Sequence, residues 1–465
     1  MRFLFCLLPL LSLFHPVLGE DRKPPFLPVL PEYPSKDDFY KPDDDFWKSD
    51  DYPPGTILKS RNVLFASMFP NVPSQAKAYQ LLYVTQDVHG EKATTVTTIV
   101  VPQKPDFNRL LSFQNAYDSP DIDCSPSYGF QNQAKGSAVT WNWAQMFVIA
   151  DFLIEGPILN IPDYEGSDAA FTVGPQAAYQ TLDSIRAAFN ATDLTGLSED
   201  ANVILFGYSG GGLATEWATE YHAHYAPELN VVGAAMGGLP THIAKTYQGV
   251  NNGTFSELDV LATLGLMNAF PQVEDYVNEH LLPEYRDVFF YPRVRCGPHE
   301  GIEEQPALSK YNITTLFDNG DGILEHFEKL LEKVGVMGQH VDKDHHPSFP
   351  LYIWQGTNDP VVNPFKDAWA LVKTFRRAGT RVKFVPRWGL GHIPALIRGL
   401  GPAWKWIGET FDKAEKQALF DTILEDHDED FLMDDTEEDS IEWSNFGAQR
   451  ILSDGEAARE HGYEL

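Results

Sequence analysis

The first stretch with residue types suited to nucleophilic catalysis contains a serine surrounded by glycines. In "VILFGYSGGGLATEW", Gly207, Ser209 and Gly211 form the pattern G-x-S-x-G. An apolar strand, Val203 to Phe206, leads in, and "GLATEWATEYHAHYA" follows with helical character. A sharp turn between strand and helix holds such a serine in a strained conformation with its hydroxyl exposed. The glycines are expected because a β-carbon there would collide with the neighbouring strand and helix, so Ser209 is the predicted nucleophile.

A serine nucleophile needs a base, and the base needs an orienting acid. On a parallel sheet both follow later strands, in the chain order Ser, Asp, His. "LYIWQGTNDPVV" is a strand that runs into a polar loop with Asp359 at its turn, and "VKFVPRWGLGHIPAL" places His392 after a strand and a Gly-rich loop. Taken singly, Asp359 could be a turn residue before Pro360, and His392 a helix-start residue. Their order on the last two strands favours a triad of Ser209, Asp359 and His392.

The oxyanion of an acyl-transfer reaction needs two hydrogen-bond donors. The residue after the nucleophile, Gly210, supplies one backbone N–H. The second is expected in the loop after an early strand, "NAYDSPDIDCSPSYGF". That loop lacks the His-Gly-Gly of many esterases, so the pattern places the second donor only within Ala116 to Ser119.

Other histidines are weaker candidates for chemistry. His222 and His224 lie on the expected helix after Ser209, directed away from its turn. His345 and His346 in "DKDHHPS" could suggest a metal site, but their loop lacks a third ligand at a usual spacing. No phosphate loop or dinucleotide motif is found, so neither a metal nor a cofactor is expected.

The elements that must position these residues alternate between strand and helix. "AYQLLYVTQ" and "ATTVTTIVVP" predict a hairpin, "WNWAQMFVIADFLIEG" a buried helix, and "PQAAYQTLDSIRAAFN" an amphipathic helix. This alternation is typical of an α/β fold with a parallel sheet covered on both faces. Residues 239–348 are mostly helical and interrupt it, so we expect a sheet core at 78–238 and 349–420 with a helical cap inserted at 239–348.

Both ends of the chain differ from this core. Residues 1–19 have the form of a secretory signal peptide, and no later segment is long and apolar enough to span a membrane. Residues 20–77 read as a Pro- and Asp-rich extended segment, and residues 421–465 as a solvated acidic tail. The 465-residue chain has a net charge of -31, which argues against binding to nucleic acid or anionic membranes.

Cysteine usage fits a secreted protein. After removal of a signal peptide two cysteines remain, Cys124 and Cys296, and an oxidising compartment should bridge them. The same compartment would allow N-glycosylation at three sequons, Asn190, Asn252 and Asn312.

Several long stretches resemble one family. "YDSPDIDCSPSY", "IPDYEGSDAAFTVGPQAAYQTLDSIRA", "GYSGGGLATEWA", "YAPELNVVGAAMGGLP", "NDPVV" and "GH" are similar to the fungal secretory lipases related to Candida antarctica lipase A. The resemblance covers most of Ala78 to Phe411. It implies an α/β-hydrolase fold with a helical cap and an enzyme that hydrolyses acylglycerols.

The resemblance also implies roles for individual residues. It makes Ser209 the nucleophile, Asp359 the acid and His392 the base, with oxyanion donors at Gly210 and at the backbone N–H of Asp118. Cys124 and Cys296 fall where the family has a disulfide, and the insert at 239–348 matches its cap. The acidic tail after Phe411 is longer than the family pattern, which puts the usual C-terminal flap in doubt.

The function expected from the sequence is that of a secreted, monomeric serine lipase or carboxylesterase that meets its ester substrate at a lipid–water interface. The alternatives are an acyltransferase or non-lipolytic esterase with the same triad, a serine peptidase, and a non-catalytic adhesion module. The cap could be a lid that opens at lipid, or a fixed wall that shapes the pocket.

Overall fold

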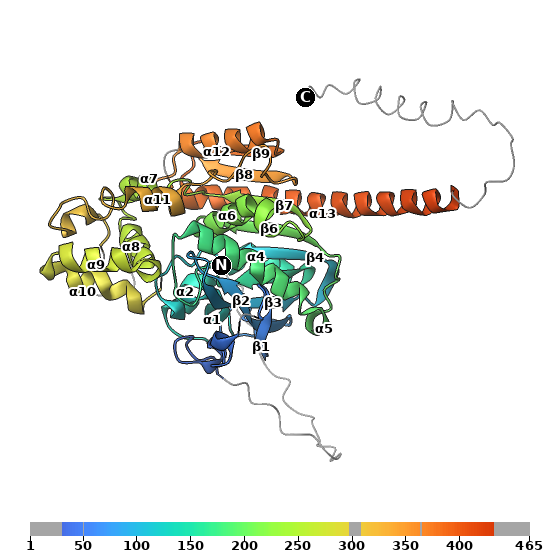
Figure 1. Cartoon of the computed structure of the whole chain (residues 1–465), viewed down its shortest axis with the longest axis horizontal. Helices are drawn as coiled ribbons and strands as arrows, with labels where there is room; N and C mark the ends of the chain where they lie inside the picture. The colour runs from blue at the N-terminus through green and yellow to red at the C-terminus, as the bar shows by residue number, and fades with distance from the viewer. Residues whose placement is uncertain (1–29, 50, 297–307, 363–364, 432–465) are drawn as a thin grey trace, which may run out of the picture. The chain divides into compact units, whose positions relative to one another are not determined.

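The computed structural model describes residues 30–49, 51–296, 308–362 and 365–431 (Figure 1). One compact unit of the chain ends at Phe411 and a second begins at Asp412. The predicted signal peptide and the acidic residues after 431 lie outside the described part. Among the described residues, no helix combines the length and the apolar character needed to cross a bilayer.

Nine strands of the described chain form one mixed sheet in the order β1-β2-β3-β5-β4-β6-β7-β8-β9. The strands are β1 (Ile57–Val63), β2 (Lys77–Gln86), β3 (Lys92–Val101), β4 (Lys104–Gln114), β5 (Glu155–Pro162), β6 (Asn202–Tyr208), β7 (Val231–Gly237), β8 (Leu351–Gly356) and β9 (Val382–Arg387). The pairs β1/β2, β2/β3 and β3/β5 are antiparallel, and all other pairs are parallel. The expected hairpin and parallel sheet are both present, joined in one sheet.

Helices cover this sheet and build the cap. The helices are α1 (Pro126–Gly129), α2 (Ser137–Trp143), α3 (Met146–Ile149), α4 (Gly174–Phe189), α5 (Thr192–Thr195), α6 (Gly210–Tyr225), α7 (Ile243–Val250), α8 (Glu257–Ala269), α9 (Pro271–His280), α10 (Arg286–Phe290), α11 (Glu328–Gly335), α12 (Phe365–Ala378) and α13 (His392–Phe431). Short 3-10 turns lie at Asp38–Tyr40, Phe46–Lys48, Ile122–Cys124, Ala150–Leu153, Pro283–Tyr285, Tyr291–Val294 and Ile313–Leu316.

The central strand β6 is buried on both faces, which explains its unbroken apolar sequence. Val203 and Leu205 belong to the core cluster on one face, together with residues of α4, α6 and α12. Ile204 and Phe206 belong to a second cluster on the opposite face, with residues of α3 and of α13 before residue 412. Alternate residues of the strand therefore pack into two separate cores, one on each face of the sheet.

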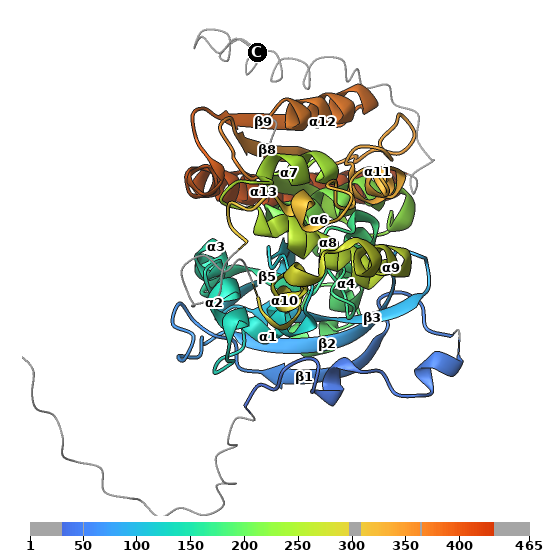
Figure 2. The same cartoon turned by 90° about the vertical axis from the view of Figure 1, so that its left-hand side faces the viewer.

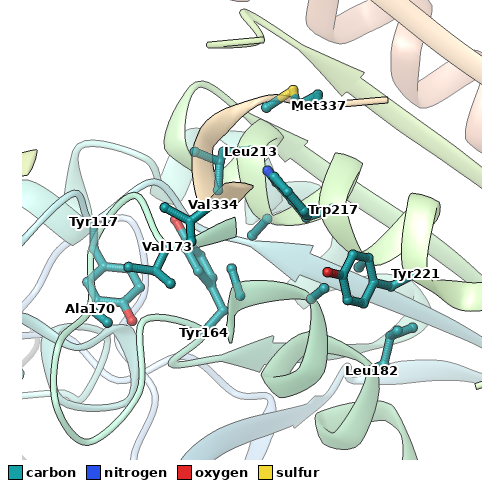
Figure 3. Close-up of a cluster of buried hydrophobic side chains, with 14 of the residues drawn as sticks. Tyr117, Tyr164, Ala170, Val173, Leu182, Leu213, Trp217, Tyr221, Val334 and Met337 are labelled. Carbon is teal, nitrogen blue, oxygen red and sulfur yellow. The ribbon is translucent and has the colours of Figure 1, made fainter. Parts of the chain in front are cut away.

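The cap between residues 239 and 348 is mostly helical and packs on the helix that follows Ser209. Figure 2 shows α8, α9 and α10 gathered together in front of the sheet. Val334 of α11 and the nearby Met337 lie in one buried cluster with Leu213, Trp217 and Tyr221 of α6 (Figure 3). The cap thus contributes to the same core as the nucleophile helix.

The N-terminal segment contributes to the sheet as well as to the surface. Strand β1 lies within residues 20–77, where the sequence suggested only an extended segment, and it pairs antiparallel with β2. Its side chains are half-buried or exposed, so it carries little of the apolar alternation that marks a strand. Pairing with the edge of β2 supplies the stabilisation that its own sequence lacks.

The single helix expected over residues 141–156 was wrong. Helix α2 ends at Trp143, α3 and a 3-10 turn follow, and Glu155 already belongs to β5. The N–H of Lys104 donates to the carbonyl of Ile154 at 3.0 Å, so the end of this segment pairs with the start of β4. Glu155 and Gly156 pair with Lys104 and Pro105 of β4, and the extended backbone of a strand excludes a helix at these residues.

The compact unit buries several carboxyl groups. Burial raises the pKa of Asp163 and of Glu220 to about 7, and that of Asp183 to about 6. Burial also raises the pKa of Glu216 well above its usual range, and the neighbouring Glu220 raises it further. These side chains are held mainly in the neutral form in weakly acidic solution.

Candidate active site

Ser209 occupies the turn between the end of β6 and the start of α6. Its backbone angles are φ 59° and ψ -125°, a left-handed conformation that costs a non-glycine residue on the order of 1–3 kcal/mol. Its N–H donates to the carbonyl of Gly237 at 3.0 Å, and its carbonyl accepts the N–H of Leu213 at 2.9 Å. The surrounding backbone therefore fixes the strained turn that exposes the hydroxyl.

The neighbouring glycines allow three backbone segments to meet at this turn. A β-carbon on Gly207 would lie 2.2 Å from the carbonyl oxygen of Gly211. A β-carbon on Gly211 would lie 1.9 Å from the carbonyl oxygen of Gln114 in β4. Both collisions are with backbone, which cannot move aside as a side chain can, so strand and helix need glycine at these positions.

The structure brings Ser209, His392 and Asp359 together, although they are far apart in the sequence. His392 Nε2 lies 2.8 Å from Ser209 Oγ, and His392 Nδ1 lies 2.7 Å from Asp359 Oδ2. Asp359 is 2% exposed and His392 7%. The arrangement can move a proton from the hydroxyl to the imidazole while the buried carboxylate holds the ring.

Backbone groups hold the acid and the base in place. Asp359 Oδ1 accepts the N–H groups of Val361 and Val362 at 2.9 and 3.1 Å, which leaves Oδ2 free for the imidazole. The hydroxyl of Tyr208 donates to the backbone carbonyl of His392 at 2.7 Å. Tyr208 directly precedes Ser209, so one short segment positions both the nucleophile and the base.

Asp118 lies against the first residue of α6. A β-carbon on Gly210 would meet Asp118 Oδ1 at 1.8 Å, so the carboxyl directly faces Gly210. Asp118 has φ 45° and is 7% exposed, and its Oδ1 has no hydrogen-bond partner among the described residues. Burial raises its pKa to about 7, although the charge of His392 opposes this. The carboxyl is therefore mainly neutral below pH 7.

A second carboxyl, Glu165, lies under the same loop. The N–H of Ser119 donates to Glu165 Oε2 at 3.3 Å, and the backbone N–H of Asp118 also lowers the pKa of Glu165. Burial outweighs both effects and raises this pKa well above its usual range, and the charge of Asp118 raises it further. Two neutral carboxyls thus lie side by side beneath the site, one of them beside Gly210.

A cavity of about 50 Å³ adjoins Ser209 and is lined by residues of both the core and the cap. Ser209, Gly210 and Asp118 line it from the core. Ile243 and Val250 of α7 and residues of α8 line it from the cap. The cavity is therefore formed jointly by the catalytic residues and by the cap.

The remaining histidines do not join the site. His222 Nε2 lies 2.9 Å from the carbonyl oxygen of Leu229, and His224 packs against Tyr221. His345 contacts Asp342 in its own loop. Across the described ranges, no group of three or more His, Cys, Asp or Glu side chains is arranged to hold a metal ion.

The cysteines and sequons also have defined places. Cys124 is bonded to Cys296, which links the loop after β4 to the cap. Asn190 and Asn252 are exposed, and Asn312 is half-buried. The amide of Asn190 donates to the carbonyl of Gly55 at 2.9 Å, so Asn252 is the most accessible of the three acceptors.

Sequence reasoning missed the groups that support the site. The Asp118 carboxyl could not be placed, because its burial depends on how the loop after β4 folds against α6. Tyr208 and the N–H groups of Val361 and Val362 carry no sequence signal beyond their position next to Ser209 and Asp359. The acidic side chain at Asp259, on the cap wall of the cavity, was also missed because helix α8 reads as an ordinary buried helix.

Comparison with known proteins decides the family. The family described as Secretory lipase matches residues 130–418, more than half of the chain. The chain belongs to the secretory lipase family. Lipase 10 of Candida albicans is 34% identical over 384 residues and covers 81% of each chain. The secreted triacylglycerol lipase LIP3 of Malassezia restricta is 31% identical over 379 residues, covering 80% of this chain and 78% of that one.

A solved structure extends the similarity to three dimensions. Candida antarctica lipase A in its closed state matches with a TM-score of 0.70 and 27% identity, covering 83% of this chain and 87% of that chain. The fold is that of the α/β-hydrolases. This confirms the fold class and the family that the sequence motifs of this secretory lipase predicted.

Because the backbone is so closely packed at the nucleophile turn, we expect one added methyl group at Gly211 to lower both stability and reactivity. We expect Gly211→Ala to lower the melting temperature and to slow labelling of Ser209 by a fluorophosphonate by about 100-fold, because small displacements of reacting groups are that costly. The matched control is Gly408→Ala in α13, where a β-carbon meets no atom within 4 Å. Normal labelling and stability of Gly211→Ala would show that the close approach to Gln114 does not constrain the turn.

Proposed function

We propose that this chain is a secreted lipase that hydrolyses acylglycerol esters through an acyl-enzyme on Ser209. The observation that carries the proposal is the hydrogen-bonded chain from Ser209 through His392 to Asp359, found in a member of the secretory lipase family. Relatives named as lipases and secreted triacylglycerol lipases support the choice of substrate. The signal-like first 19 residues support export.

In the proposed reaction His392 Nε2 takes the proton of Ser209 Oγ as the oxygen attacks the ester carbonyl. The imidazolium is stabilised by Asp359 and then gives its proton to the leaving alcohol. Water enters, His392 takes a proton from it, and attack on the acyl-enzyme releases the fatty acid and restores Ser209. The protein groups that move the proton, Ser209, His392 and Asp359, already lie within hydrogen-bond distance of one another.

Hydrogen-bond donors at Gly210 and Asp118 stabilise the oxyanion. The backbone N–H of Gly210 starts helix α6, and Asp118 lies against it. The family resemblance implies the backbone N–H of Asp118 as the donor, which would have to exchange its interaction with Glu165 for the oxyanion. The neutral carboxyl of Asp118 beside Gly210 also has a proton to donate. Either donor requires an uncharged carboxyl, because a negative charge would oppose the developing oxyanion. Loss of one such donor costs about 10²- to 10³-fold in rate.

An exposed apolar surface next to the base supports action at a lipid surface. Trp388, Ile393 and Ile397 are 76%, 54% and 58% exposed, and they flank His392 in the sequence. Trp388 contacts the ring of Phe365 at 6.3 Å between centroids. Exposed apolar side chains beside a catalytic group are suited to contact with lipid. Since α7 and α8 of the cap line the cavity beside Ser209, they are placed to cover the site, and the cap is proposed to act as a lid at the lipid surface.

The test of the function is labelling and turnover with one substitution at the nucleophile. We expect the wild-type chain to hydrolyse triacylglycerol emulsions and p-nitrophenyl esters but not peptide anilides, and to carry a fluorophosphonate adduct on Ser209. Ser209→Ala should abolish the adduct and lower turnover by at least about 10³-fold. Ser198→Ala, in the loop before β6, is the control. Cleavage of the anilides alone would favour a peptidase, and an unlabelled Ser209 would end the proposed mechanism.

The buried Asp118 predicts a pH dependence. Because its pKa is raised to about 7, the carboxyl becomes charged as the pH rises above 7, and kcat/KM for a soluble ester should then fall by about tenfold per pH unit. Asp118→Asn is neutral at every pH and should lack this fall. An alkaline decline that is identical in both proteins would assign it to another group.

The apolar surface predicts a difference between two forms of substrate. We expect the double variant Trp388→Ser, Ile397→Ser to lower the rate on emulsified triacylglycerol by about tenfold and the rate on a dissolved ester by much less, because only the first needs adsorption to lipid. The wild-type rate should also rise steeply once the substrate forms droplets. Equal losses on both substrates would show that the side chains support the fold and not the lipid contact.

A further inference from the structure

The catalytic cavity contains a carboxyl group for which the proposed mechanism has no use. Besides Asp118, the acidic side chain that lines the cavity is Asp259 of α8. It lies on the cap wall, among apolar neighbours such as Leu258 and Ala262. Ser209 lines the same cavity from the core. A group bound there would therefore be part of, or close to, the reacting ester.

Asp259 is buried with one of its carboxyl oxygens unpartnered in the described part of the chain. It is 1% exposed, and its Oδ2 has no hydrogen-bond partner among the described residues. Burial alone raises its pKa well above the usual range, with no opposing cationic group. Burial therefore favours the protonated form of the side chain, which can both donate and accept a hydrogen bond.

Neither an interaction with the helix dipole nor the filling of space explains an acid at this position as well as binding of a ligand does. Asp259 lies in the first turn of α8, where a charged carboxylate would interact favourably with the helix dipole. Its neutral form gains little from that interaction. An apolar residue of similar size would fill the space without an unsatisfied buried group. The carboxyl is therefore best explained by a group that enters the cavity.

The side chains around Asp259 indicate which kind of ligand group can bind there. Tyr247 and Thr246 of α7 line the same cavity, and Asp259 raises the pKa of Tyr247, with burial as the larger cause. This corner is polar but uncharged. An anionic group would have to lose its water in a cavity whose described lining offers no cation, an ammonium group would have to lose its water in the same apolar site, and a plain hydrocarbon chain would leave the acid unsatisfied. A hydroxyl group satisfies both the donor and the acceptor of Asp259.

We propose that Asp259 is a specificity-determining residue that hydrogen-bonds a free hydroxyl group carried by the ester substrate in the catalytic cavity. The proposal rests on the proposed ester hydrolysis at Ser209. The hydroxyl can come from the acyl part, as in an ester of a hydroxy acid. It can also come from the alcohol part, as in a partial glyceride. Both present the same chemistry to Asp259.

Matched esters test the proposal and separate the two sources. The acyl source is tested by p-nitrophenyl 3-hydroxybutyrate against p-nitrophenyl butyrate. The alcohol source is tested by 2-hydroxyethyl butyrate against ethyl butyrate, followed by acid release. In at least one pair we expect the wild-type kcat/KM to favour the hydroxylated ester by about tenfold, the effect of one well-formed hydrogen bond. The pair that shows the preference identifies the source.

Variants then assign the preference to Asp259. Asp259→Leu should bring the ratio of the two kcat/KM values close to one, mainly through KM, and Asp259→Asn, which keeps the shape and both hydrogen-bonding functions, should retain part of it. Asp275→Asn, on the exposed face of α9, removes a cap carboxylate outside the cavity and should leave both ratios unchanged. If Asp259→Leu does not fold, a reduced preference in Asp259→Asn with normal hydrolysis of the ester that lacks the hydroxyl would still support the site, and an unchanged preference in Asp259→Asn would overturn it.

The outcomes distinguish this inference from the proposed function. Hydrolysis of all four esters with no preference in the wild-type protein would overturn the role of Asp259 and leave the lipase proposal standing. A preference that survives Asp259→Leu would do the same. Failure of the wild-type protein to hydrolyse any of the esters would overturn the proposed function, and this inference with it.

Discussion

Close contact between three backbone segments is the constraint on which the rest of this molecule depends. Strand β4, strand β6 and helix α6 approach so closely at Ser209 that Gly207 and Gly211 have no room for a side chain. The same contact forces Ser209 into a left-handed conformation and presents its hydroxyl to His392. Strain at the nucleophile and stability of the sheet are thus two results of one packing arrangement.

The cap and the catalytic helix are parts of one folded unit. Apolar residues of α11 pack on α6, and Glu220 of α6 accepts the backbone N–H groups of Gly338 and His340 from the cap. The disulfide ties the cap to the loop that carries Asp118. Helix α11 is therefore joined firmly to α6, while α7 and α8 form the cap wall of the cavity.

The parts of the fold set by local sequence could be predicted, and those set by distant contacts could not. The turn around Ser209, the strands before Asp359 and His392, and the helical insert all carry local patterns of period and glycine placement. Strand β1 and the break after Trp143 depend on pairing with β2 and β4, so no local signal marks them. The neutral carboxyls of Asp118 and Asp259 depend on burial by residues far away in the chain.

The buried acids have a consequence for where the protein is most stable. Asp163, Glu165, Glu216 and Glu220 keep their protons in the folded unit at a pH where the same groups in an unfolded chain, with a pKa near 4, have lost them. Folding near neutrality therefore takes up protons from solution. By linkage, the stability contributed by these groups is complete below about pH 4 and declines as the pH rises toward 7. These buried acids therefore contribute more to stability in weakly acidic solution than at neutral pH.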